Sequence, residues 1–122
     1  MSGSPTIRWV RILIGGFAAE VLVFAVVIPV VLLAGQRPLL YLVPPACFVS
    51  CLLLTIWVCR PLESGFVLHG ALVGVVATVL YVAMTRAGPE PFAYLLAHGL
   101  KILGGTAGGF VAGRRPAKPR TA

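Results

Sequence analysis

Hydrophobic residues along the chain fall into four long runs, separated by short clusters of proline, glycine and charged residues. The runs cover residues 12–34, 39–59, 66–85 and 91–112. Each has about 20 residues or slightly more, and a helix of that length spans the ~30 Å hydrocarbon core of a bilayer. Because lipid offers no partners to backbone N–H and C=O groups, we expect each run to form a helix.

The connections between the runs are short, so consecutive helices must run in opposite directions. The sequence therefore predicts an all-α membrane protein, a compact antiparallel bundle of four transmembrane helices within residues 12–112, preceded by residues 1–11 and followed by a basic tail, 113–122. Of all residues, 59% are hydrophobic and 11% are charged. Soluble domains have about 25% charged residues. The composition excludes a soluble globular domain and a disordered chain.

Positive charge is shared unequally between the two sides of the predicted bundle. Ten Lys and Arg residues stand against three acidic ones, which gives a formal net charge of +7. Seven of the ten lie in the N-terminus, the second loop and the tail, which share one side, and two lie in the other loops. By the positive-inside rule we expect both termini in the cytoplasm and the protein in a bacterial inner membrane. The tail is expected to contact anionic lipid headgroups, not nucleic acid, through Arg114, Arg115, Lys118 and Arg120.

Polar side chains within the predicted helices need partners, because a charge at the centre of a bilayer costs roughly 2.5–3.5 kcal/mol. Glu20 and Lys101 lie ~12 Å and ~16 Å from the expected cytoplasmic face, so we expect them to pair or to share a water-lined site. His98 lies one turn from Lys101 on the same helix face, at a depth that suits Tyr81. The pair is open to two interpretations, a packing and registry device or an ion or proton site. A third is that no pair forms and Lys101 extends towards the interface. His69 is expected at the cytoplasmic interface.

Small residues are spaced three or four positions apart in every predicted helix. The glycines of these faces are Gly16, Gly70, Gly74, Gly104, Gly105, Gly108 and Gly109. Glycine at this spacing lets helix backbones approach closely where lipid supplies no hydrophobic driving force. We therefore expect tight packing, either within the chain or against a second copy.

The sequence lacks the residue sets of common enzymes and metal sites. Its three cysteines all lie in the second run, and they are interpreted as small apolar packing residues. The glycine-rich segment of the fourth run follows no strand and lacks the Lys-Ser/Thr ending of a phosphate-binding loop. We expect no enzymatic activity, no cofactor and no bound metal.

The first run contains the segment Gly15-Gly16-Phe17-Ala18-Ala19-Glu20-Val21. This segment is similar to the first helix of the small multidrug resistance family, in which two glycines lead to Ala-Glu-Val. The resemblance implies a homodimer in which Glu20 carries substrate and protons. The family has no counterpart of Lys101, and its aromatic third-helix motif is absent here. The ending Gly-Gly-x-x-Gly-Gly-x-x-Ala-Gly-Arg-Arg also resembles small bacterial membrane proteins.

Two hypotheses for function follow from these features. The first is a non-enzymatic membrane protein, an oligomerising or accessory subunit of a larger complex, held by glycine-rich faces and a buried Glu20–Lys101 pair. The second is a small proton-coupled transporter or pore in which Glu20 is the titrating residue, with Lys101 and His98 nearby.

Overall fold

The computed structural model describes residues 6–86, 88–90 and 92–114. They form four helices, α1 (Trp9–Ala34), α2 (Leu39–Val58), α3 (Phe66–Met84) and α4 (Phe92–Gly113), and this part of the chain contains no strand. All four helices are long and apolar enough to cross a membrane. The predicted all-α bundle of four helices is confirmed. α1 begins earlier than the hydrophobic run, at Trp9, and so includes Arg11, whose side chain donates hydrogen bonds to the carbonyls of Trp57 and Val58 at the end of α2.

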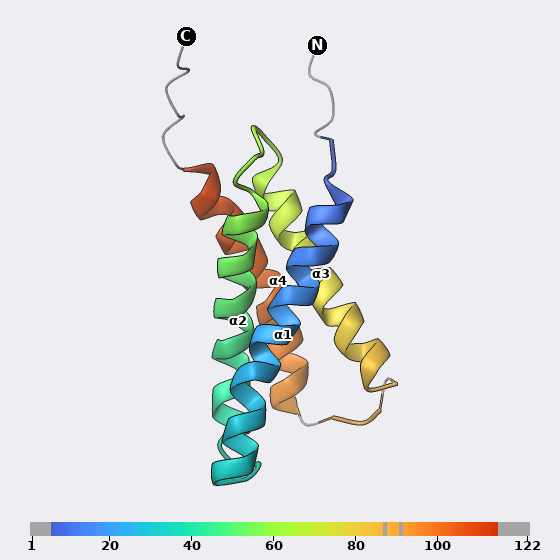
Figure 1. Ribbon diagram of the computed structural model, residues 1–122, viewed down its shortest axis with the longest axis vertical. Coiled ribbons are helices and arrows are strands. Elements are labelled where there is room, and N and C mark those ends of the chain that lie inside the picture. Colours follow the sequence, from blue (N-terminus) through green and yellow to red (C-terminus); the bar gives the residue numbers. More distant parts are fainter. Residues whose placement is uncertain (1–5, 87, 91, 115–122) are drawn as a thin grey trace.

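The helices alternate in direction, and the start of α1 lies at the same end of the bundle as the end of α4 (Figure 1). We call this the terminal end and the opposite one the distal end. α1 packs on α2 and α3, α4 packs on the same two helices, and α2 also touches α3. Within the described helices no Cα atom of α1 comes within 8 Å of one in α4. α1 and α4 therefore face each other diagonally across the centre of the bundle.

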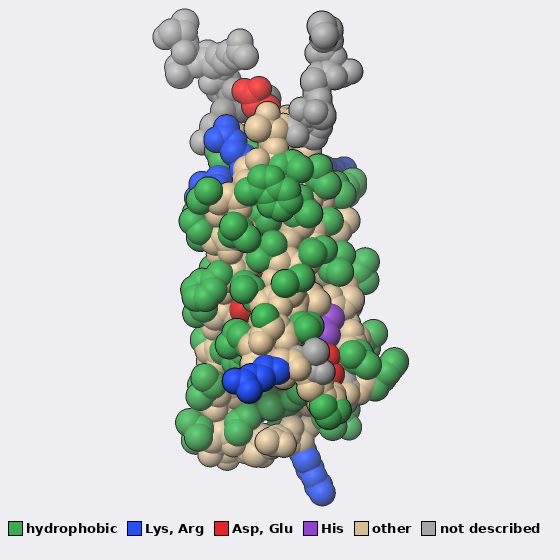
Figure 2. Space-filling model, turned by 90° about the vertical axis from the view of Figure 1, so that its right-hand side faces the viewer, with side chains coloured by type: hydrophobic (Ala, Val, Ile, Leu, Met, Phe, Trp, Pro, Cys, Tyr) green, Lys and Arg blue, Asp and Glu red, His purple; other side chains and the backbone are tan. Residues whose placement is uncertain are grey.

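The outer surface of the bundle is largely apolar. Figure 2 shows hydrophobic side chains over most of its length, with lysine and arginine side chains towards the two ends. Of the most apolar stretch of α1, only 17% is buried inside the bundle. Its exposed side chains include Leu13, Phe17 and Leu22. Such a surface suits lipid and not water, and the protein is a multi-pass membrane protein.

α4 packs its glycines against two different helices. Gly104 and Gly108 lie against the backbone of α2, and a Cβ atom on Gly108 would stand 2.6 Å from the Leu52 carbonyl oxygen. Gly105 and Gly109 lie against the backbone of α3. Consecutive residues of a helix are ~100° apart, so doubled glycines repeated after four residues produce two smooth faces, not one. The pattern Gly-Gly-x-x-Gly-Gly thus fits α4 between α2 and α3.

Glycines of α1 and α3 also lie in close contact with neighbouring helices. Gly70 of α3 lies against Gly105, and a Cβ atom on Gly74 would stand 2.6 Å from the Lys101 carbonyl oxygen. A Cβ atom on Gly16 of α1 would lie 2.5 Å from a methyl group of Val76. All these contacts are within one chain. The expected tight glycine packing is therefore used to build the bundle itself.

Candidate intramembrane polar site

An ion pair joins the two diagonal helices at the centre of the bundle. Lys101 Nζ of α4 contacts Glu20 Oε1 of α1. The two residues are 2% and 3% exposed, so both charges are removed from solvent and lipid. Glu20 lies ~17 Å along α1 from the terminal end and Lys101 ~18 Å along α4, near the middle of each helix. The long lysine side chain crosses the distance that the two backbones leave between them.

Three aromatic or acidic side chains extend this centre towards the distal end. Lys101 Nζ lies 4.7 Å from the centroid of the Tyr81 ring, a cation–π contact. The Tyr81 ring centroid lies 4.8 Å from that of His98. His98 Nε2 lies 2.9 Å from Glu90 Oε1. A continuous series of ionisable groups thus leads from Glu20 in α1 to Glu90, in the connection before α4.

A small cavity of about 90 Å³ adjoins the ion pair. A water molecule takes about 30 Å³ in the liquid, so the cavity has room for about three. Its lining combines apolar side chains such as Val23 and Val43 with the polar groups of the centre. The polar lining residues are Glu20, Tyr81, Tyr94, His98 and Lys101.

Several buried polar atoms of this region lack hydrogen-bond partners among the described residues. They are both oxygens of Glu20, Glu90 Oε2 and His98 Nδ1; of these atoms, Glu20 Oε1 has the Lys101 ammonium group as its ion-pair partner. A buried polar atom without a partner costs roughly 1–3 kcal/mol. Carboxylate oxygens only accept hydrogen bonds, so the groups that would satisfy them are donors such as water. The cavity beside Glu20 has the size and polarity to hold that water.

The structure brings some of the candidate residues predicted from the sequence together and adds one that was not predicted. Glu20, Lys101, Tyr81 and His98 come together in one site. Glu90 was not singled out from the sequence, because it stands among the prolines and glycines that separate the third and fourth runs. The signal was present, because Glu90 is the acid closest along the chain to His98 and Lys101. An unpartnered histidine in a membrane helix calls for such a group.

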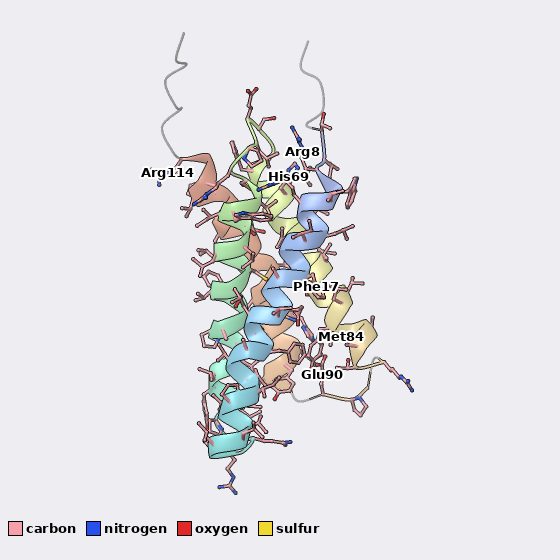
Figure 3. The ribbon with its side chains drawn as sticks, in the orientation of Figure 1. Arg8, Phe17, His69, Met84, Glu90 and Arg114 are labelled. Carbon is pink, nitrogen blue, oxygen red and sulfur yellow. The ribbon has the colours of Figure 1, made fainter. Side chains whose placement is uncertain are left out.

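His69 lies near the terminal end, but it is completely buried and not interfacial as expected. Its Nε2 accepts a hydrogen bond from the Arg8 backbone N–H at 3.1 Å. Nδ1 must then carry the ring proton, and it donates to the Gly65 carbonyl at 2.7 Å. Figure 3 shows Arg8 and His69 together at this end, with Glu90 in the other half of the bundle. His69 thus fastens the segment before α1 to the start of α3.

We expect His69→Phe to loosen this attachment without disrupting the centre of the bundle. The phenyl ring fills similar space, but it leaves the Arg8 N–H without its acceptor and the Gly65 carbonyl with only the backbone N–H of residue 69. Loss of the two hydrogen bonds should cost about 1–3 kcal/mol locally. Hydrogen–deuterium exchange should accelerate at the Arg8 amide and remain unchanged around Lys101. Unchanged exchange at Arg8 would contradict this role of His69.

The basic tail is described only at its beginning. Arg114 is exposed at the terminal end, and its guanidinium carbon lies 5.5 Å from the centroid of the Phe110 ring. Arg115, Lys118 and Arg120 lie outside the described residues.

In the described part of the chain, no group of three or more His, Cys, Asp or Glu side chains is arranged to hold a metal ion. Cys47 and Cys51 are buried in the core, beside Val43 and Ala77. The fold and the centre define a small multi-pass membrane protein with a buried ion pair between diagonal helices. Comparison with protein-family models, curated proteins and solved structures finds no match to this chain.

Proposed function

We propose that the protein is a non-enzymatic membrane protein that takes up and releases protons at Glu20, as a small proton-coupled transporter or pore. The observation that carries this proposal is the geometry at Glu20. One carboxylate oxygen contacts Lys101, neither oxygen has a hydrogen-bond partner among the described residues, and the residue lines a cavity. A group in this position can accept a proton from water in the cavity.

The energetics of the ion pair support a proton-dependent change at this site. Two charges in a membrane interior carry a large desolvation penalty, which their mutual attraction offsets only while both are charged. A proton on Glu20 would neutralise the carboxylate and leave Lys101 without its counter-ion. The ion pair that connects α1 and α4 would then be lost. Protonation is in this way connected to the packing of two diagonal helices.

A second candidate is the accessory or oligomerising subunit, in which the ion pair only holds the helices in register. The complete burial of both partners between glycine-packed helices favours it. Because the glycine faces contact helices of the same chain, a partner subunit or second copy would use the lipid-facing surface instead. The exposed apolar side chains of α1, such as Phe17, offer such a surface.

The membrane and its orientation also belong to this proposal. Seven of the ten basic residues belong to segments at the terminal end, which supports a bacterial inner membrane protein with both termini in the cytoplasm. At that end Arg114 is positioned to contact anionic headgroups, and the sequence alone suggests the same contact for Arg115, Lys118 and Arg120.

Proton flux through reconstituted vesicles tests the function directly. With a pH gradient and a potassium diffusion potential imposed, we expect the wild type to dissipate the gradient. Glu20→Gln should slow this flux by about 100-fold, because it removes the proton acceptor while keeping the side-chain shape. Glu63→Gln is the matched control, since Glu63 is exposed in the second loop and should leave the flux unchanged. Equal flux in Glu20→Gln and wild type would favour the accessory subunit.

A further inference from the structure

Apart from the Cys47 and Cys51 thiols, the ionisable groups next to the Glu20–Lys101 pair lie on its distal side. Tyr81, His98 and Glu90 follow one another in that direction, and the cavity is lined by Tyr81 and His98. The side chains of His98 and Glu90 are 13% and 17% exposed, whereas Glu20 and Lys101 are almost fully enclosed. The series therefore runs from a partly exposed position to the buried centre.

The terminal side of the pair is closed by backbone contacts and apolar side chains. Gly70 and Gly105 bring α3 and α4 together so closely that a Cβ atom has no room on either. Ile12, Val58 and Val73 form a fully buried cluster closer to the terminal end. The buried polar side chains on this side, Ser50, Thr55 and His69, do not line the cavity beside Glu20.

We propose that Glu90 and His98 form a proton entrance that connects Glu20 to the distal side of the membrane and not to the terminal side. The inference rests on the proposed function, because it assumes that Glu20 exchanges protons. It adds to that function the route of the proton, the two entrance residues and the side of the membrane from which protons arrive.

The route is a transfer of one proton along a series of lone pairs. A proton from the aqueous phase binds at Glu90 or at the ring nitrogen of His98 that faces it. The opposite ring nitrogen, Nδ1, which has no hydrogen-bond partner among the described residues, then gives its proton to water in the cavity. That water donates a proton to Glu20, and His98 is left neutral with its remaining proton on Nε2. The balance is one positive charge gained by the site, and release follows the same steps in reverse.

The surroundings of Glu20 restrict where the proton arrives. Lys101 faces the carboxylate from α4, Tyr81 lies beside Lys101 from α3, and the Cys47 and Cys51 thiols lie on the α2 side. The positive charge of Lys101 repels a proton approaching Oε1. We therefore expect the transfer to end at Oε2, the oxygen away from the Lys101 contact at Oε1.

A hydrophobic carbodiimide tests this route, because it reacts with membrane carboxylic acids in the protonated form. The wild type is reconstituted in vesicles whose inner and outer pH are set separately, and orientation is read from protease access to a C-terminal tag. Mass spectrometry follows labelling of Glu20. We expect the labelling rate to follow the pH on the distal side and to ignore the pH on the terminal side.

The entrance residues are tested in the same vesicles. Glu90→Gln and His98→Phe should reduce the response of Glu20 labelling to distal pH by at least about tenfold. Glu63→Gln should behave as wild type. If labelling follows terminal pH, both sides equally, or distal pH undiminished in both variants, the proposed route is wrong although Glu20 still exchanges protons. If Glu20 labelling responds to pH on neither side, the proposed function itself fails. The wild-type measurement decides the side even where a variant does not fold.

Discussion

Gly105→Ala is expected to destabilise the protein more than any other single methyl addition in α4. The new Cβ atom would overlap the Gly70 carbonyl oxygen, with the Gly70 carbonyl carbon at 2.9 Å and the Gly74 nitrogen at 3.3 Å. These are backbone atoms and cannot rotate away, so α3 and α4 would have to separate. Overpacking that displaces backbone costs about 3 kcal/mol or more. The free energy of unfolding in detergent micelles, followed by circular dichroism, measures the loss.

Gly99→Ala provides a matched control on the same helix. Nothing lies within 4 Å of a Cβ atom at Gly99, which is exposed on the outer surface. Alanine favours the helix by about 1 kcal/mol over glycine at either position. Gly99→Ala should therefore leave stability unchanged or slightly raised. Equal stability of the two variants would show that α3 and α4 do not touch at Gly105.

The sequence was informative about glycine spacing but not about which partner each glycine meets. Four hydrophobic runs of membrane-spanning length were sufficient for the fold, since lipid permits few alternatives to a helix. The doubled glycines of α4 predicted close packing. A helix face alone does not tell whether the neighbour belongs to the same chain or to another copy. The order of helices around the bundle settles this, and no local pattern encodes that order.

The candidate site was partly predictable for a similar reason. Glu20 and Lys101 were found because charge is conspicuous in an apolar helix and their depths agree. Glu90 stands in the connection before α4, where a charged residue is ordinary and draws no attention. His69 was placed correctly near one end, but its burial depends on where the segment before α1 passes. Contacts made by irregular segments depend on the tertiary structure, and the periodicity of hydrophobic residues in the sequence does not predict them.

Removing one partner of the Glu20–Lys101 pair is expected to be strongly destabilising. Lys101→Met leaves the Glu20 carboxylate buried with neither its cation nor, among the described residues, a hydrogen-bond donor. Glu20→Gln leaves the Lys101 ammonium group buried against the Tyr81 ring. Breaking a buried pair in this way costs about 3–5 kcal/mol. Both losses are measurable as lower stability to denaturing detergent, read from the same circular dichroism signal.

The double variant Glu20→Gln, Lys101→Met distinguishes a structural role of the pair from a functional one. It removes both charges together, so we expect it to recover about 2 kcal/mol or more relative to the sum of the single losses. Additive losses would mean that the two residues do not interact. If the pair serves packing alone, the double variant should regain both its stability and any proton flux that the single variants lose. If Glu20 carries protons, the double variant folds well and still conducts none, because the group that accepts the proton is gone. Stability in detergent and proton flux in vesicles, measured on the same variants, thus distinguish a structural from a functional role of the ion pair.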